Sequence, residues 1–295
     1  MHSHAQVPTA LPMPELGLIR VYFAPRPRPN YSITSFVDVD IRNPLRVLYL
    51  HDRPIFEPGP PGSFDEHGVM PQCVIRRDNE VWLYYAGWSR RESIPYSNWI
   101  GLAISHDDGC TFSRAFSGPV LDRTRVEIYS GTGLFVVPQA ADRFAGFYAT
   151  GLGWQLRDGH LEEKYVIARA VSNDGVNWIR DGRALLPERH LDECTTRPSV
   201  ARIAERWHMW FCHRGRADFR DGVNAYRIGY AQSADLLSWT RMDELAGIAP
   251  TTGDWDSSMI AYPYVVEAGG RHFMFYNGNG FGRTGFGVAQ LERVG

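Results

Sequence analysis

The chain alternates short apolar segments with polar turns from one end to the other. The clearest unit runs from 63 to 88 and holds two apolar strands, 69–75 and 81–86, separated by the polar turn 77–80. No segment repeats its apolar residues with the period of an amphipathic helix, so the pattern predicts β-strands. Similar units return at intervals of roughly 50–60 residues, which indicates a repeat architecture.

Each unit begins with a strand that carries a proline, or in one case glycines, near its start. The five starts are 6–11, 70–74, 131–137, 197–201 and 262–266. A turn and an aromatic strand follow each start, at 19–23, 81–85, 144–148, 207–211 and 272–276. Third strands follow at 100–105, 166–172, 228–233 and 285–289. Three of the third strands run into a turn that contains Ser and Asp, which suits a tight reversal into a fourth strand.

Four short strands in each of five units predict an all-β fold, a five-bladed β-propeller. We expect one domain over residues 1–295, with blades at approximately 1–62, 63–124, 125–190, 191–253 and 254–295. The last unit is short, so we expect it to lack a full fourth strand or to borrow one. The alternative is a β-sandwich with chance similarity between its strands, which leaves the recurrence unexplained.

Composition narrows the class of protein. Of the 295 residues, 44% are apolar and 22% are charged, which is typical of a soluble globular protein. The net charge of −2 argues against a surface for nucleic acid or anionic membrane, and the apolar runs are shorter than the ~18 residues of a membrane span. We see no signal peptide and no CxxC pair among the four cysteines. We therefore expect a cytoplasmic protein with reduced thiols, and leave its oligomeric state open.

Residues just before the innermost strand of each blade crowd together at one end of a propeller's channel. Four of the five blades carry an acid there, and Asp65 and Asp192 stand at the same distance before their prolines. We therefore place the candidate site at this end of the channel. Its candidate residues are His2, His4, Asp65, Glu66, His67, Glu127, Tyr129, Ser130, Asp192, Glu193, Asp254 and Asp256.

The ends of the second strands should rim the same mouth. Candidates there are Arg26, Arg28, Trp88, Trp154, Gln155, His213, Arg214, Asn277 and Asn279, and Arg197 and Tyr262 precede the prolines of their own strands. Aromatic faces, carboxylates, amides and arginines that converge on a pocket suit a sugar. His4 and His67 could help to hold a structural central metal ion. No HxH or HExxH spacing supports a catalytic metal, and no cofactor is expected.

Glycoside cleavage needs two carboxyl groups across the scissile bond, one protonated and one ionised. A ring of acids at a channel mouth can supply both, because like charges close together raise the pKa of one of them. Each acid taken alone also fits a turn. Trp88 either stacks on a sugar or packs between blades, and Arg197 either pairs with a carboxylate or ties the fourth blade together. His213 and Arg214 either bind an anion or form a surface pair.

The blades, the acids before the inner strands and the closing segment FYNGNGFGRTGFG at 275–287 resemble the five-bladed propeller glycoside hydrolases. The arabinanase/xylosidase, invertase-like and mannoside phosphorylase families are the most similar. The resemblance to arabinanases implies three acids as base, pKa modulator and general acid, at Asp65, Glu127 and Glu193. Glu193-Cys194 also resembles the Glu-Cys motif of invertase-like enzymes. The chain departs from these families by His4 at the first acid position and by lacking the Asn-Asp-Pro-Asn and Arg-Asp-Pro signatures.

We expect a carbohydrate-active enzyme of polysaccharide metabolism that cleaves a glycosidic bond of an oligosaccharide or glycoside. Glu193 is the expected general acid, Asp65 the base or nucleophile, and Glu127 an orienting group. The expected substrate-binding residues are His4, Glu66, His67, Trp88, Ser130, Arg197, His213, Arg214, Asp256, Tyr262 and Asn277. Two alternatives stay open. One is a glycoside phosphorylase, with Arg28, His213 and Arg214 as phosphate ligands, and the other is a non-catalytic sugar-binding propeller.

Overall fold

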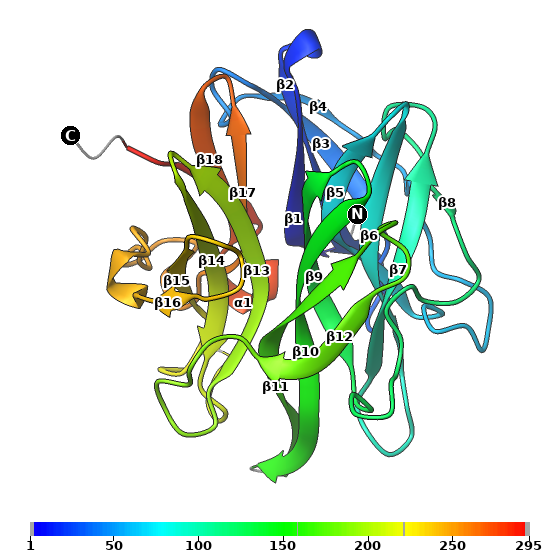
Figure 1. Ribbon diagram of the computed structural model, residues 1–295, viewed down its shortest axis with the longest axis vertical. Coiled ribbons are helices and arrows are strands. Elements are labelled where there is room, and N and C mark those ends of the chain that lie inside the picture. The colour runs from blue at the N-terminus through cyan, green and yellow to red at the C-terminus, as the bar shows by residue number, and fades with distance from the viewer. Residues whose placement is uncertain (1–2, 158, 221, 293–295) are drawn as a thin grey trace.

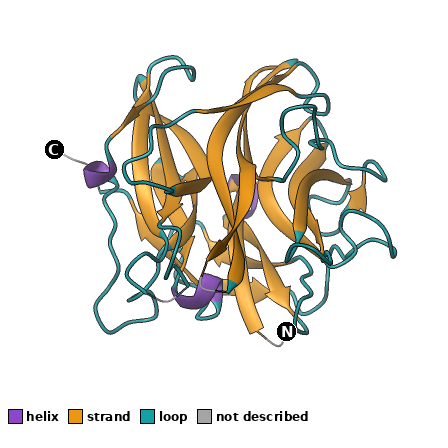
Figure 2. Ribbon diagram, turned by 90° about the horizontal axis from the view of Figure 1, so that it is seen from below, coloured by secondary structure: helices purple, strands orange, loops and turns teal. Residues whose placement is uncertain are grey.

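The computed structural model describes residues 3–157, 159–220 and 222–292 and consists of five small antiparallel sheets (Figure 1). The innermost strands β1, β5, β9, β13 and β17 each contact the next in order, and β17 contacts β1. This ring of contacts confirms the predicted five-bladed β-propeller. Strands form nearly all of the regular structure, with only short helical segments (Figure 2). In the described part of the chain, no helix has the length and apolar character needed to cross a membrane.

In each sheet, the strands follow one another in chain order from the innermost to the outermost. Blade 1 contains β1 (Ser3–Met13), β2 (Leu18–Arg26), β3 (Ser35–Asp40) and β4 (Val47–Leu50). Blade 2 contains β5 (Gly68–Arg77), β6 (Glu80–Ser89), β7 (Ser97–Ser105) and β8 (Ser113–Arg114). Blade 3 contains β9 (Gly131–Ala140), β10 (Arg143–Arg157), β11 (His160–Ser172) and β12 (Ile179–Ala184).

Blade 4 contains β13 (Cys194–Ile203), β14 (Arg206–Arg214), β15 (Arg227–Ser233) and β16 (Thr240–Arg241). Blade 5 contains β17 (Ala261–Ala268), β18 (Arg271–Asn277) and β19 (Phe286–Gln290). Its three strands agree with the short last repeat of the sequence. The helical segments are η1 (Pro14–Leu16), η2 (Asp243–Leu245) and α1 (Asn279–Gly282).

The repeated proline marks a β-bulge in the innermost strand. The pairing register shifts at this point in all five blades. Val7, Arg197 and Tyr262, each followed by proline, have φ values of 52°, 51° and 56°, and Gly133 has 66° at the matching place in blade 3. A bulge bends its strand and redirects a side chain. The sequence repeat therefore reflects a bend that each blade makes beside the central channel.

Arg197 uses this bend to reach across the channel. Its Nη1 donates to the carbonyl of Pro71 (3.1 Å) and to Gln72 Oε1 (2.8 Å), and its Nη2 donates to Thr9 Oγ1 (2.8 Å) and to two further carbonyls of blade 1. The side chain is buried, and burial lowers the pKa of Arg197 to about 10, so the group stays protonated at neutral pH. Its hydrogen bonds tie blade 4 to blades 1 and 2.

Among the described residues, no strand is shared between the first and last blades where the ring closes. Asn277 at the end of β18 accepts a hydrogen bond from the backbone N–H of Val7 (2.7 Å) and donates one to the carbonyl of Ala5 (2.7 Å). Arg271 at the start of β18 donates to the carbonyls of Ile41 (3.0 Å) and Arg42 (2.9 Å). Hydrogen bonds between side chains and backbone groups therefore connect blade 5 to blade 1.

Candidate active site

Four of the acids that precede the inner strands, Asp65, Glu127, Glu193 and Asp256, lie buried inside their own blades, whereas Asp254 is exposed. Each of three is ion-paired with an arginine from the outermost strand of the same blade, an arrangement we name the acid–arginine clamp. The clamps are Asp65 with Arg114 (2.7 Å), Glu127 with Arg180 (3.0 Å) and Glu193 with Arg241 (2.6 Å). Because the outer arginine reaches inward over the blade, each clamp fastens the outermost strand to the start of the innermost one.

In three of these four acids, the carboxylate also accepts a hydrogen bond from a tyrosine hydroxyl in the second strand of the blade. Tyr85 donates to Asp65 (3.1 Å), Tyr148 to Glu127 (2.6 Å) and Tyr276 to Asp256 (3.0 Å). Asp256 also accepts from the backbone N–H of Thr251 (3.2 Å). The in-register recurrence of acids in the sequence thus has a structural origin within each blade. The predicted catalytic roles of Asp65 and Glu127 and the predicted binding role of Asp256 stay predictions that this geometry does not favour.

Glu193 departs from its counterparts. Phe211 stands where blades 2, 3 and 5 have tyrosine, opposite Gly229 as Tyr85 stands opposite Gly101. In place of a tyrosine hydroxyl, His213 Nδ1 lies 3.3 Å from Glu193 Oε1. Burial raises the pKa of Glu193, but hydrogen bonds from Arg241 and His213 outweigh it and hold this pKa well below the usual range. A general acid has to be protonated at the working pH, so nothing here supports that predicted role for Glu193.

Several predicted binding residues have structural contacts instead. Asn277 and Arg197 take part in ring closure and in the crossing of the channel, as described above. Trp88 Nε1 donates to Ser32 Oγ in blade 1 (2.8 Å), which favours its packing between blades. His67 lies beside Trp88, with ring centroids 5.9 Å apart, and Glu66 accepts from the backbone N–H of Gly62 (2.8 Å).

His4 and Tyr262 are both partly buried. Burial and the charges of Arg26 and Arg283 lower the pKa of His4 to about 4, so its ring is neutral at pH 7. Tyr262 packs beside Tyr226, with ring centroids 5.6 Å apart. His2 lies outside the described residues. Within the described ranges, no group of three or more His, Cys, Asp or Glu side chains is arranged to hold a metal ion.

The sequence interpretation missed Glu163, which lies in the third strand of blade 3. Ser130 Oγ donates a hydrogen bond to Glu163 Oε1, and the side chain is 3% exposed. Burial raises the pKa of Glu163 to about 7, although the hydrogen bond from Ser130 and the charge of Arg214 lower it. Ser130, a predicted binding residue, therefore contacts the carboxyl group of Glu163, which can hold a proton near neutral pH.

The second strand of blade 3 leaves room for this carboxyl. A Cβ on Gly151 would lie 2.4 Å from Glu163 Oε1, so only glycine fits there. Trp154 pairs directly with Glu163 across β10 and β11, and Tyr96 meets Trp154 edge-on at 5.0 Å. Glycines inside an apolar strand indicate a close approach, and the pair at 151 and 153 is the signal that could have pointed to Glu163.

Arg214 joins Glu163 to its surroundings. Its Nη2 donates to the carbonyl of Glu163 (3.1 Å), its Nε donates to Tyr165 Oη (2.7 Å), and its guanidinium stacks on Phe219 at 3.7 Å from the ring centroid. Tyr165 in turn shares a hydrogen bond with Tyr226. Arg214 is thus a buried group that connects blades 3 and 4, rather than half of an exposed surface pair.

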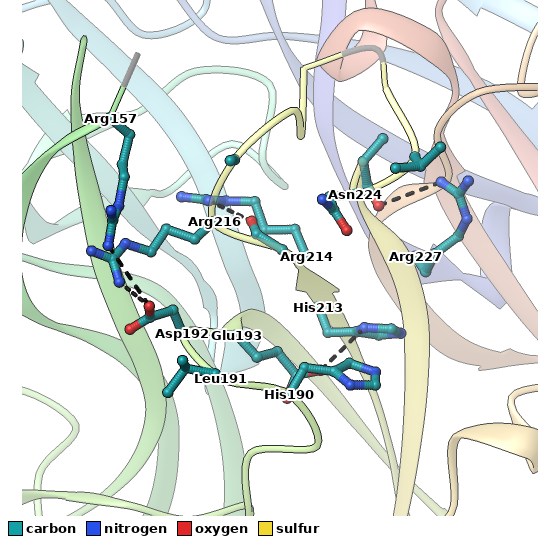
Figure 3. A pocket seen from close by; sticks show the side chains of 14 residues that line it. Arg157, His190, Leu191, Asp192, Glu193, His213, Arg214, Arg216, Asn224 and Arg227 are labelled. Carbon is teal, nitrogen blue, oxygen red and sulfur yellow. Dashed lines mark hydrogen bonds and ion pairs between the residues drawn. The ribbon is translucent and has the colours of Figure 1, made fainter. Parts of the chain in front are cut away.

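A pocket of about 560 Å³ opens beside this cluster (Figure 3). Its walls come from the end of β10, the segment before β13, the end of β14 and the segment that leads to β15. Of the predicted residues, Asp192, Glu193, His213 and Arg214 line it, whereas Asp65, Glu127, Asp256 and Arg28 do not. Glu163 is not a lining residue and is joined to the pocket through Arg214. The backbones of Glu163 and Glu193 are close, because Cys194, which follows Glu193, contacts the carbonyl of Glu163 through its Sγ (3.6 Å).

Comparison with known sequences finds relatives in Mycobacterium tuberculosis. No family model matches it. The uncharacterized proteins MT1551 and Rv1502 of Mycobacterium tuberculosis are each 37% identical over 294 residues, which cover 98% of this chain and 93% of theirs. The chain belongs to the family of these mycobacterial proteins. This relationship extends over nearly the whole length of the family's members.

Comparison with solved structures shows the fold of glycoside hydrolases. A glycoside hydrolase matches with a TM-score of 0.74 at 17% identity, over 100% of this chain and 89% of that one. An endo-arabinase from Bacteroides thetaiotaomicron matches with a TM-score of 0.67 at 11% identity, over 99% and 95% of the two chains. A structure from the GH130 family of mannoside phosphorylases matches with 0.69 at 15% identity, over 98% and 84%. The family thus shares the five-bladed propeller fold of these enzymes, as the sequence resemblance implied.

Proposed function

We propose that the protein is a carbohydrate-active enzyme that cleaves a glycosidic bond, with Glu163 as its general acid. The observation that carries this proposal is the pairing of two carboxylic residues with opposite environments. Glu163 is buried against a hydroxyl and has a pKa of about 7, whereas Arg241 and His213 hold Glu193 ionised. Acid–base cleavage of a glycoside needs one carboxyl of each kind.

The roles follow from the protonation states. Protonated Glu163 would give its proton to the glycosidic oxygen as the bond to the anomeric carbon breaks. Ionised Glu193, which lines the pocket, would stabilise the positive charge that develops on the sugar or accept a proton from the attacking water. Trp154, directly across from Glu163, would offer an aromatic face to the sugar ring. The fold shared with glycoside hydrolases supports the same class of reaction.

Glu163→Gln tests the proposal. Turnover should fall by ~10²-fold or more, the loss typical of removing a general acid, when released sugars are measured from a panel of oligosaccharides and nitrophenyl glycosides. Glu127→Gln is the matched control, because this clamp acid is equally buried but has no contact with Arg214, the pocket residue that holds Glu163. Unchanged turnover in Glu163→Gln would remove this residue from the mechanism. Adding inorganic phosphate to the same assay separates the two reactions, since a sugar 1-phosphate product means phosphorolysis.

A non-catalytic sugar-binding propeller is the second candidate. The observation in its favour is the structural use of Asp65, Glu127 and Glu193 in the acid–arginine clamps. Such a protein would bind an oligosaccharide and return it intact. Calorimetric binding of a sugar that the wild-type protein does not consume over hours would select this candidate, whereas any turnover lost in Glu163→Gln would exclude it.

A further inference from the structure

The pocket beside Glu193 holds more positive than negative charge. Its charged lining residues are Arg157, Arg214, Arg216, Arg227, Asp192 and Glu193. Glu193 is already paired with Arg241, which lies behind the wall. Since the whole chain has a net charge of −2, this excess of cations is a local property of the pocket and not of the protein.

The remaining acid does not balance the cations around it. Asp192 is ion-paired with Arg216, and both Arg157 and Lys164 lie 3.9 Å from its carboxylate. Lys164 has a second partner in Glu188 (2.8 Å). Three cations therefore converge on one carboxylate at this wall of the pocket.

The opposite wall carries a cation that only neutral groups contact in the described part of the chain. Arg227 Nη1 donates to the carbonyls of Tyr226 (2.9 Å) and Ser258 (2.9 Å). Carbonyl oxygens satisfy hydrogen bonds but do not neutralise the charge. In Figure 3, Arg216 and Arg227 lie on opposite sides of the pocket, with Asn224 between them.

One donor in this pocket is buried without a partner. Arg216 is 9% exposed, and its Nη2 has no hydrogen-bond partner among the described residues. An unpaired buried donor is unfavourable, more so on a charged group. A bound anion that accepted from this nitrogen would remove the penalty, which marks Arg216 as part of a binding site.

We infer that this pocket binds the phosphate group of a phosphorylated sugar. Donors that approach from two walls suit a tetrahedral dianion, whereas a planar carboxylate would be satisfied by a single arginine fork. At about 560 Å³ the pocket has the size of a small-molecule site and exceeds what a phosphate ion fills alone, so the anion is carried on a larger molecule. The inference rests on the proposed function, because Arg214 joins this pocket to Glu163 and would place the sugar beside that acid.

Isothermal titration calorimetry on the full chain tests the inference. The probes are glucose 1-phosphate, mannose 1-phosphate and mannose 6-phosphate, the matching neutral hexoses, and inorganic phosphate. We expect at least one sugar phosphate to bind ten-fold or more tightly than inorganic phosphate and than its neutral sugar. Equal affinity for inorganic phosphate would overturn the assignment in favour of a free-phosphate site, and the absence of binding by every phosphate probe at millimolar concentration would overturn the site itself.

Arg227→Gln locates the binding. It removes a charged donor from the pocket and should weaken sugar-phosphate affinity by about 10- to 100-fold, the usual loss of a hydrogen bond to a charged group. Arg143→Gln is the matched control, since Arg143 is exposed at the opposite end of the strand that carries Arg157, and its affinity should stay unchanged. Unfolding midpoints equal to that of wild type would show that both variants are folded. Equal sugar-phosphate affinity in wild type, Arg227→Gln and Arg143→Gln would contradict the assignment.

The same measurements keep the inference apart from the proposed function. Sugar-phosphate binding by a wild-type protein that turns over no substrate of the panel would sustain the pocket and reject the enzyme. Turnover of neutral glycosides in a protein that binds no phosphate probe would sustain the enzyme and reject the pocket.

Discussion

Buried carboxyl groups in this protein have opposite environments according to the residue that faces them. Glu163 meets the hydroxyl of Ser130, whereas Glu193 meets the guanidinium of Arg241. Burial alone raises the pKa of a carboxyl, and a charged partner reverses that effect. One group therefore keeps its proton near neutral pH and the other stays ionised, which is the division that acid–base chemistry requires.

Glu163 should make the stability of the fold depend on pH. Its pKa rises from an ordinary 4.5 to about 7 on folding, so between these values the folded chain holds a proton that the unfolded chain releases. Stability should therefore fall as pH rises through this window, by about 3 kcal/mol in total if the whole shift is realised. Glu163→Gln should lose this dependence, as seen by urea unfolding at pH 5 and pH 8. An equal pH dependence in both proteins would show that Glu163 titrates normally.

The residue scale is also where the sequence was least informative. The recurrence of acids before the inner strands points to Asp65, Glu127 and Glu193, but this recurrence follows from the clamp that blades 2, 3 and 4 repeat. Glu163 occurs in one blade only, so no repeat points to it. Its raised pKa depends on burial by residues from three separate segments, which no local pattern in the sequence contains.

At the scale of the blade, the acid–arginine clamp fastens the outermost strand, which is often only two residues long. β8 spans Ser113–Arg114 and β16 spans Thr240–Arg241, and each ends in the arginine that reaches the acid. So short a strand has few backbone hydrogen bonds of its own. The clamp is therefore part of what holds a fourth strand in the blade.

Asp65→Asn tests the clamp in blade 2. The change leaves the partly buried guanidinium of Arg114 without its counter-charge, and we expect a loss of about 3 kcal/mol in the free energy of unfolding. Glu66→Gln, at the neighbouring and more exposed position, should cost well under 1 kcal/mol. Urea unfolding measures both. Unchanged stability in Asp65→Asn combined with lost turnover would instead restore the predicted catalytic role of Asp65.

The blades themselves could be predicted because the same order of strands and turns recurs along the sequence. The proline strands, the aromatic second strands and the Ser-x-Asp turns all recur at similar spacing, and in the structure the Asp of each turn caps backbone N–H groups, as Asp107 and Asp174 do. The bulge at the proline was not predictable, because a residue before proline ordinarily stays extended. Val7 and Arg197 adopt positive φ there, and each has hydrogen bonds to another blade, from the Val7 N–H to Asn277 and from the Arg197 side chain to blades 1 and 2.

At the scale of the whole molecule, the first and last blades share no strand within residues 3–292 as far as these are described, so side-chain contacts across the channel and at the closure help to hold the ring together. Arg197 is the residue that spans the channel. Its partners are carbonyl, amide and hydroxyl oxygens of two other blades, and none of those oxygens belongs to a carboxylate. Burial of such a cation is unfavourable, and the five hydrogen bonds that Arg197 donates offset it.

Arg197→Met should therefore weaken the ring as a whole. Methionine retains much of the apolar stem but leaves Gln72, Thr9 and three carbonyl oxygens without their shared donor, and each buried unpaired acceptor costs about 1–3 kcal/mol unless water replaces it. We expect a loss of at least about 3 kcal/mol in urea unfolding, with a single transition, because the residue joins three blades. Ligand affinity measured below the unfolding transition should match wild type. A variant that keeps its stability but loses sugar binding would instead place Arg197 in the binding site, as the sequence first predicted.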